Sequence, residues 1–212
     1  MNVKDMLRQA SDAAKQLITL SDQTIIGILK ETAQVLRTHT EEVLAANRQD
    51  LERMDPANPK YDRLKLTEER LQGIAADMEN VSTLPSPLNK VLSETTRPNG
   101  MVIRKVTVPF GVIGVIYEAR PNVTFDVFSL CFRSGNVCVL KGGSDADFSN
   151  RALVRIIHSV LERQGINPAV CTLLPPDREA TAELLGAVGL VDLIIPRGSS
   201  SLIHFVREHA KV

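Results

Sequence analysis

Apolar residues recur at helical spacing at the start of the chain. One apolar stripe runs through residues 3–20, which is the pattern of an amphipathic helix. A second stripe begins after Ser21 or Asp22, either of which can cap a helix, and the helical pattern continues to Leu51. These residues therefore predict consecutive helices.

A proline-containing break separates these helices from a further one. Segment 55–59 carries a proline near each end, and this composition interrupts the helical pattern. The next apolar stripe follows Thr67, a suitable capping residue, and it stops before Pro85. We therefore expect residues 1–87 to form an all-helical segment that packs on the rest of the protein.

The pattern then changes from helical to extended. Residues 101–108 combine β-branched side chains with partial alternation, which is typical of a strand. The turn signal Pro98-Asn99-Gly100 precedes them, and residues 88–95 can supply the partner strand. The sequence therefore predicts a β arm over residues 88–109.

Strand-like and helical patterns alternate through the remaining residues, 110–212. Short apolar runs with strand character occur at residues 112–117, 136–140, 170–174 and 191–195. Helical patterns occur at residues 125–132, 147–164, 178–188 and 200–211. This order predicts an α/β fold with a parallel sheet and right-handed crossovers.

Composition excludes several classes of function. The chain has 25 basic and 25 acidic residues, so its charge gives no reason to expect nucleic acid or an anionic membrane as a partner. No apolar run approaches the roughly 20 residues of a membrane span, and the charged N-terminus does not resemble a secretory signal. An odd count of three cysteines argues against a disulfide framework and favours the cytoplasm.

The cysteines and histidines do not form a recognisable catalytic or metal site. Cys131 falls in a helical run and Cys138 in a strand, where we expect both to be buried as small apolar residues. His204 and His209 are five positions apart, which does not place them well on one helix face. We therefore expect no metal site.

Two glycine-containing turns are the best candidates for phosphate or nucleotide binding. Lys141-Gly142-Gly143-Ser144 directly follows a predicted strand and opens a helix, with Ser144 as a candidate N-cap. Arg197-Gly198-Ser199 repeats the arrangement after the last predicted strand, with serines to cap the helix that follows. Either turn alone could be an ordinary loop. The pair could hold the two ends of one phosphorylated cofactor.

For two other glycines and one polar turn, a purely structural role competes with a role in ligand binding. Gly111 and Gly114 do not form the usual dinucleotide fingerprint, and close strand packing explains them better. Arg120-Pro121-Asn122 places a guanidinium and a carboxamide at the end of a strand. Asn122 could donate a hydrogen bond to a developing oxyanion, or it could simply cap the next helix.

Residues 108–122 (Val-Pro-Phe-Gly-Val-Ile-Gly-Val-Ile-Tyr-Glu-Ala-Arg-Pro-Asn) and 136–144 (Asn-Val-Cys-Val-Leu-Lys-Gly-Gly-Ser) closely resemble the gamma-glutamyl phosphate reductases. This family, also called glutamate-5-semialdehyde dehydrogenase, belongs to the aldehyde dehydrogenase superfamily. Residues 195–201 are part of the same resemblance, which continues to Val212. The resemblance implies a three-layer αβα Rossmann-type parallel sheet, preceded by helices and a β-hairpin arm.

The resemblance also implies an activity and its partners. The family reduces gamma-glutamyl phosphate to glutamate 5-semialdehyde with NADPH, in the second step of proline biosynthesis. Glutamate 5-kinase acts in the same pathway, and family subunits associate through a β arm like residues 88–109, which implies a homodimer.

Site residues carry over position by position. Asn122 matches an asparagine of the oxyanion hole, and Lys141 matches a lysine that contacts the adenosine ribose. Ser144 stands where NAD-preferring relatives carry a ribose-binding glutamate, so the resemblance favours NADP(H), although Asp145 is adjacent. The remaining implied contacts are to the cofactor, from Gly142, Gly143, Arg197, Gly198 and Ser199. Arg120 has no clear counterpart, and we expect it to bind the acyl phosphate.

One departure from the family limits this prediction. The family attacks the acyl phosphate with a cysteine in a Cys-Asn-Ala motif, and this motif does not occur here. The family is also roughly twice as long, so the resemblance implies an N-terminal half that is inactive by itself, with an α/β domain (110–212) incomplete at its C-terminal end. Two alternatives stay open: a non-catalytic nucleotide-binding or interaction module, and a superfamily enzyme for another acyl substrate.

Overall fold

The computed structural model describes residues 2–212 and confirms the predicted α/β fold class. The parallel sheet has the order β5-β4-β3-β6. These strands are Cys171–Leu173, Val137–Lys141, Val112–Tyr117 and Leu193–Arg197. The chain runs outward from β3 through β4 to β5, and then returns to place β6 on the other side of β3. The strand order therefore reverses at β3, which is where open α/β sheets bind ligands.

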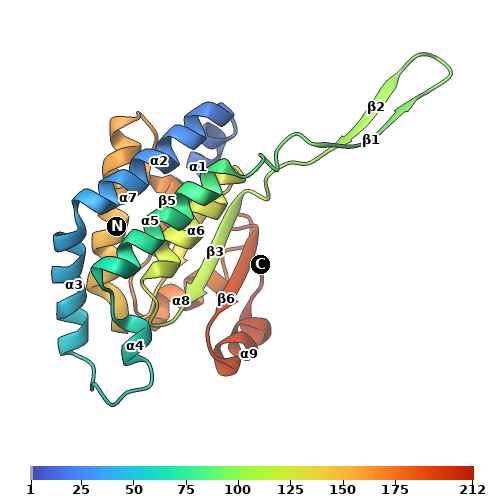
Figure 1. The fold of residues 1–212 in the computed structure, drawn as a ribbon. Coiled ribbons are helices and arrows are strands. Elements are labelled where there is room, and N and C mark those ends of the chain that lie inside the picture. Colours follow the sequence, from blue (N-terminus) through green and yellow to red (C-terminus); the bar gives the residue numbers. More distant parts are fainter. Residues whose placement is uncertain (1) are drawn as a thin grey trace.

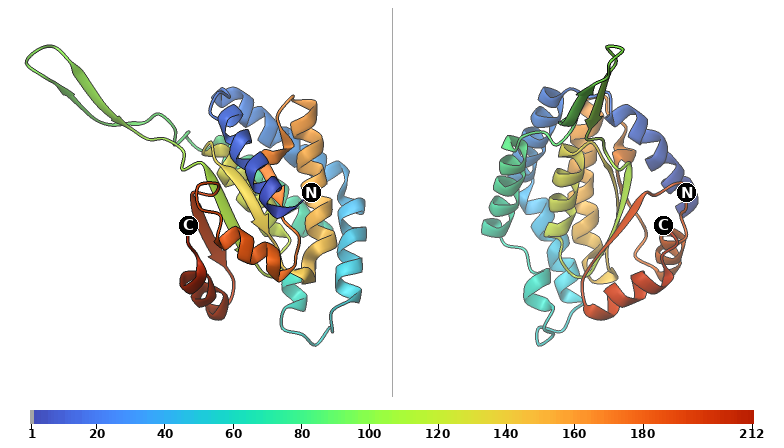
Figure 2. Two further views of the ribbon diagram at one scale, coloured as in Figure 1. Left: turned by 180° about the vertical axis from the view of Figure 1, so that it is seen from behind. Right: turned by 90° about the vertical axis from the view of Figure 1, so that its right-hand side faces the viewer.

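Helices cover both faces of the sheet (Figures 1 and 2). α6 (Asn122–Arg133) and α7 (Asp147–Arg163) lie on one face, and α1 (Val3–Leu17) and α8 (Arg178–Leu185) lie on the other. Right-handed crossovers require this arrangement, because the connection through α8 runs in the opposite direction to the two before it. α9 (Ser200–His209) follows β6.

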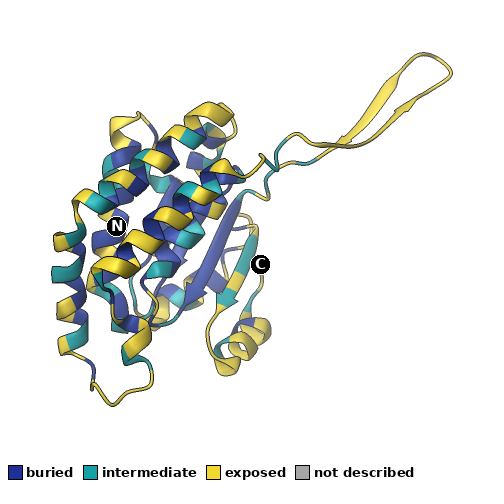
Figure 3. Ribbon diagram, viewed as in Figure 1, coloured by how far each residue is buried: buried dark blue, intermediate teal, exposed yellow. Residues whose placement is uncertain are grey.

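The other long helices form an outer layer on α6 and α7. α5 (Glu68–Thr83) packs against α6, whereas α2 (Asp22–Thr38) and α3 (Thr40–Glu52) pack against α7. One cluster of buried apolar residues extends from Leu7 in α1 to Val206 in α9, as the dark blue regions of Figure 3 illustrate. The helical segment and the sheet therefore share a core.

Local capping residues explain where several helices begin. Ser21, rather than Asp22, caps α2 by accepting a hydrogen bond from the Thr24 amide, and Thr67 caps α5 as predicted. The periodic pattern did not predict the break at His39 between α2 and α3. It also did not predict α4 (Tyr61–Leu64), a single turn between the break at residues 55–59 and Thr67.

The predicted β arm is confirmed as an antiparallel hairpin. β1 (Val91–Thr96) pairs with β2 (Val102–Val106), and Gly100 closes the turn with a positive φ of 83°. Every residue of both strands is exposed, and the hairpin projects away from the body of the protein (Figures 1 and 3). Its apolar side chains are therefore left exposed by the rest of residues 2–212.

Candidate functional site

The carboxyl ends of β3 and β6 meet at the point where the strand order reverses. Tyr117, the last residue of β3, is the register partner of Arg197, the last residue of β6. A cavity of about 370 Å³ opens beyond these ends. Its lining residues are Pro59, Lys60, Arg63, Glu118, Ala119, Arg120, Arg197, Gly198 and Ser199. The fold therefore brings Arg120 together with the predicted Arg197-Gly198-Ser199 turn.

A neighbouring cavity of about 430 Å³ contains Asn122 together with Arg120. Asn122 is the first residue of α6, so it is not the N-cap; Pro121 occupies that position and makes no side-chain cap. The Asn122 Nδ2 donates to Oδ2 of Asp126 at 3.1 Å. This bond uses one of the two amide hydrogens and orients the group, which leaves the second hydrogen available to another acceptor.

Asp126 connects the two cavities electrostatically. Its carboxylate lies 3.6 Å from the Arg197 guanidinium, besides accepting the hydrogen bond from Asn122. Burial raises the pKa of Asp126, an effect that the Arg197 charge and the Asn122 hydrogen bond partly oppose. Arg197 and Asn122 are thereby held by a single carboxylate.

The β6–α9 turn forms a helix N-terminus as predicted. Ser199 caps α9 by accepting a hydrogen bond from the Leu202 amide at 3.3 Å. The Ser199 hydroxyl also donates to Oε1 of Glu118 at 3.1 Å. A Cβ at Gly198 would lie 2.8 Å from Cδ2 of Leu202, so a larger residue there would require the Leu202 side chain to move.

The turn after β4 differs in two respects from the sequence prediction. Lys141 is not part of the turn: it is the last residue of β4, and its side chain is buried. Its Nζ donates to the carbonyls of Gly142 at 3.1 Å and of Pro176 at 3.2 Å. Burial lowers the pKa of Lys141, although the charge of Asp177 opposes the shift.

Ser144 does not cap the next helix, so that prediction was wrong. It begins a short 3-10 turn, Ser144–Ala146, and α7 starts only at Asp147. The amides of Phe148 and Ser149 in the first turn of α7 donate to Asp50, a buried carboxylate on α3. A distant residue therefore supplies the cap, and the Ser144 side chain stays exposed.

The two glycine turns approach each other around Glu118. A Cβ at Gly143 would lie 3.8 Å from the Glu118 Cα, and one at Gly198 would lie 3.0 Å from the Glu118 carboxyl carbon. The predicted pairing of the two turns at neighbouring strand ends is thus compatible with the geometry. Their roles in cofactor binding stay predictions.

Sequence reasoning missed several charged residues of this region. Lys60 and Arg63 come from the α4 segment, and no local motif distinguishes them. Glu118 follows β3 directly but was passed over between the residues on either side. Asp126 had a usable signal, because it lies four positions after Asn122 on a helix, where side chains meet.

The three cysteines lie in the interior of the protein. Cys131, Cys138 and Cys171 are all buried and free, which confirms the prediction for the first two. Burial raises the pKa of Cys131, a shift that disfavours the reactive thiolate. Within residues 2–212 there is no group of three or more His, Cys, Asp or Glu placed to hold a metal, and no helix suited to crossing a bilayer.

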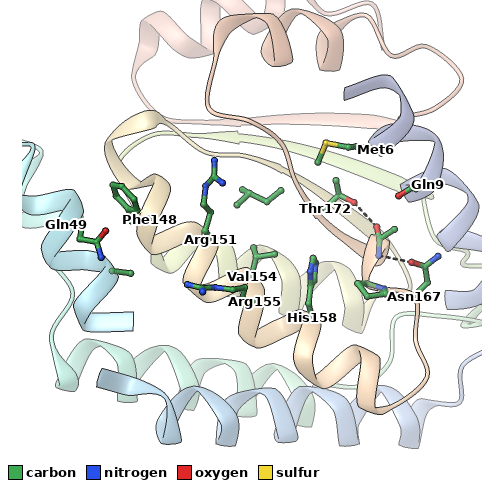
Figure 4. Close-up of a pocket in the computed structure, with 14 residues that line it drawn as sticks. Met6, Gln9, Gln49, Phe148, Arg151, Val154, Arg155, His158, Asn167 and Thr172 are labelled. Atoms are coloured by element: carbon green, nitrogen blue, oxygen red, sulfur yellow. Dashed lines mark hydrogen bonds between the residues drawn. The ribbon is translucent and has the colours of Figure 1, made fainter. Parts of the chain in front are cut away.

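A cavity of about 830 Å³, larger than the two described above, lies apart from these turns. It runs along α7 between α1 and α3 and reaches the edge strand β5, as Figure 4 shows for Arg151, His158 and Thr172. None of the predicted site residues lines it. Size alone therefore does not identify the functional site.

Comparisons with known proteins confirm the resemblance noted in the sequence. Over all 212 residues the chain is 99% identical to a gamma-glutamyl phosphate reductase from Parabacteroides distasonis, of which it covers 51%. The crystal structure of gamma-glutamyl phosphate reductase from Thermotoga maritima matches with a TM-score of 0.96 and 32% identity, covering 100% of this chain and 52% of that one. The chain spans about half the length of the curated relatives it matches. No family model matches it.

More distant structures share the fold. A NAD-dependent benzaldehyde dehydrogenase from Corynebacterium glutamicum matches with a TM-score of 0.77 at 18% identity, over 97% of this chain and 42% of that one. This likeness confirms the aldehyde-dehydrogenase-like architecture. At this identity it carries no conclusion about substrate or cofactor.

Proposed function

We propose that this chain, whose whole length matches half of known gamma-glutamyl phosphate reductases, is the cofactor-binding half of such an enzyme. The reaction is the NADPH-dependent reduction of gamma-glutamyl phosphate to glutamate 5-semialdehyde and phosphate, in proline biosynthesis. The 99% identity over all 212 residues is the observation that carries this proposal.

The residues at the strand ends fit a dinucleotide. Gly198 lines the cavity next to Ser199, and a Cβ at Gly143 would meet no atom nearer than 3.8 Å, so the chain leaves room beside both turns. Gly142 instead packs closely against Asn150, whose amide nitrogen would lie 2.3 Å from a Cβ there. The N-terminus of α9 offers partial positive charge for a pyrophosphate beside Ser199. Lys141 adds a fixed ammonium at the end of β4. When bound, NADPH supplies the hydride.

Asn122 and Arg120 act on the substrate in this proposal. Asn122 uses its free amide hydrogen to stabilise the oxyanion that develops on the acyl carbon, while its bond to Asp126 fixes the orientation of the group. Arg120 attracts the acyl phosphate. The thiolate nucleophile comes from outside this chain, because all three of its cysteines are buried and Cys131 and Cys138 have raised pKa values.

We expect the chain to bind NADPH at least tenfold more tightly than NADH. Ser144 is exposed and puts no carboxylate against a 2′-phosphate, and the charge of the adjacent Asp145 is partly balanced by Lys60 at 3.8 Å.

Isothermal titration calorimetry with both cofactors tests this preference and the proposed function. Ser144→Glu should weaken NADPH binding by about tenfold, or ~1.4 kcal/mol. The matched change Ser93→Glu on the exposed arm should have no effect. Equal affinity of the Ser144→Glu variant for NADPH would contradict the prediction.

We also propose that the β arm pairs with a second copy of the chain. Exposed apolar residues such as Leu92 and Ile103 need a partner surface. The two ends of the arm, at Leu88 and Pro109, both pack against Gly135, so a short glycine–serine linker can replace residues 90–106. Light scattering should give a dimer for the 212-residue chain and a monomer for the shortened one. Equal masses would refute the proposal.

A further inference from the structure

The α4 segment brings two basic residues of the N-terminal helices to the carboxyl ends of the strands. Lys60 and Arg63 line the cavity that also contains Arg120, Arg197 and the Gly198 turn. Arg63 and Arg120 line the neighbouring cavity with Asn122 as well. Arg63 thus borders both the predicted cofactor turn and the predicted oxyanion donor.

The backbone that carries Arg63 is held firmly in place. Leu64 is fully buried, and its carbonyl accepts a hydrogen bond from Nδ2 of Asn47 at 2.9 Å. The Asn47 Oδ1 in turn accepts from the Leu66 amide at 2.8 Å. Nη1 of Arg70 donates to the carbonyls of Asp62 and Lys65, at 2.6 Å each. A single helical turn is therefore fixed on both sides of Arg63, which lowers the entropy lost when a ligand binds there.

The charges of this region are unevenly compensated. Arg197 lies 3.6 Å from Asp126, and Lys60 lies 3.8 Å from Asp145. Within the described residues 2–212, neither Arg63 nor Arg120 has an ion-pair partner. Glu118 lines the first cavity with them and accepts a hydrogen bond from Ser199. Asp62 and Asp77 line the neighbouring cavity, where Asp62 pairs with Arg70 at 3.0 Å. Two guanidinium groups without ion-pair partners at one cavity are suited to a phosphate group, whose oxygens can accept paired hydrogen bonds.

We propose that Arg63 and Arg120 together bind a phosphate group in this cavity, so that the α4 segment contributes directly to ligand binding. The phosphate can come from the acyl phosphate substrate or from the diphosphate of the cofactor, which share this chemistry. The choice between them rests on the proposed function, whereas binding of the phosphate group does not.

Titration of the 212-residue chain with inorganic phosphate at low ionic strength tests the site. We expect Arg63→Ala to weaken binding at least tenfold, or ~1.4 kcal/mol, with Arg63→Lys in between because a lysine cannot bind in two-pronged fashion. Arg48→Ala is the matched control, since Arg48 is an exposed arginine of the same helical segment that lines neither cavity. Wild-type phosphate affinity in Arg63→Ala, or no binding by the unchanged chain, would overturn the proposal.

NADPH titration of the same variants separates the two sources. If Arg63→Ala loses phosphate affinity but keeps NADPH affinity, the site serves the acyl phosphate. A parallel loss of both affinities assigns it to the cofactor diphosphate, and either result supports a phosphate site. If no variant binds NADPH while the effect on phosphate persists, the proposed function fails and the phosphate site stands. Because the Arg63 side chain is exposed, unchanged thermal unfolding should accompany these effects.

Discussion

Replacing Asp50 by alanine should lower the free energy of unfolding by about 3 kcal/mol, because one buried carboxylate supplies several hydrogen bonds at once. Its oxygens accept from the amides of Phe148 and Ser149, at 3.1 and 2.8 Å, and from the Ser149 hydroxyl at 2.6 Å. Asn47 completes this network by donating to the same hydroxyl at 3.0 Å. Truncation would leave the first turn of α7 uncapped and these donors unsatisfied.

Urea unfolding of three variants would measure this effect. Asp50→Asn keeps one acceptor oxygen and should lose less stability than Asp50→Ala. Glu52→Ala is a suitable control, because Glu52 is an exposed acidic residue on the same helix. Burial raises the pKa of Asp50 above its usual range while the bonds from Ser149 and Phe148 oppose that shift, so the comparison belongs at pH 8, where the carboxylate is ionised. An effect of Asp50→Ala within 0.5 kcal/mol of the control would contradict the prediction.

The same network explains why the start of α7 could not be predicted from the sequence. Local rules favour a nearby Ser or Asp as a cap, so Ser144 was the natural choice. The actual cap, Asp50, lies 98 positions before Phe148 in the sequence. Only the packing of α3 against α7 brings the two together. The prediction failed where a tertiary contact replaced a local one.

The sequence predicted the strongly periodic helices and strands correctly, but it predicted their boundaries less accurately. β3 was predicted with its observed bounds, because Val112–Tyr117 is a continuous apolar run between polar turns. α6 begins at Asn122, three residues before its predicted start, since the turn-like residues Pro121 and Asn122 concealed its first turn. Thr124 in that turn is buried, and its hydroxyl forms hydrogen bonds with the Tyr117 hydroxyl and with Oδ1 of Asn150. The residue type alone does not predict these contacts.

For the candidate site, too, residues in local motifs were easier to predict than residues placed by tertiary contacts. Gly198 and Ser199 follow a strand directly and could be located by motif. The position of Arg63 at the cavity could not be predicted, because α4 has only four residues and its place depends on Asn47 and Arg70. Lys141 was predicted to begin the turn but is the last residue of β4, since a charged residue is unexpected at a buried strand end. Its ammonium is tolerated there because two carbonyls accept its hydrogen bonds.

Removing the buried ammonium of Lys141 should have opposite effects on NADPH binding and on the stability of the fold. Lys141→Met should weaken NADPH binding by roughly 10- to 100-fold, the effect of losing a charged hydrogen bond of about 1.5–3 kcal/mol. The same change should leave stability at pH 7 equal or raised. The lowered pKa means that burial disfavours the charged form, and methionine keeps most of the apolar volume of the side chain.

The pH dependence of stability provides the decisive control for Lys141→Met. Because the pKa of Lys141 is lower in the folded chain than the usual value of about 10.4, the unfolded chain binds more protons between the two values. Wild-type stability should therefore gain from deprotonation as pH rises through that window, and any advantage of the methionine variant should shrink. Urea unfolding at pH 7 and pH 10, with calorimetric titration of NADPH at pH 7, measures both effects. A variant that loses more than about 1 kcal/mol of stability at pH 7 would show that the two carbonyl hydrogen bonds outweigh the cost of burying the charge.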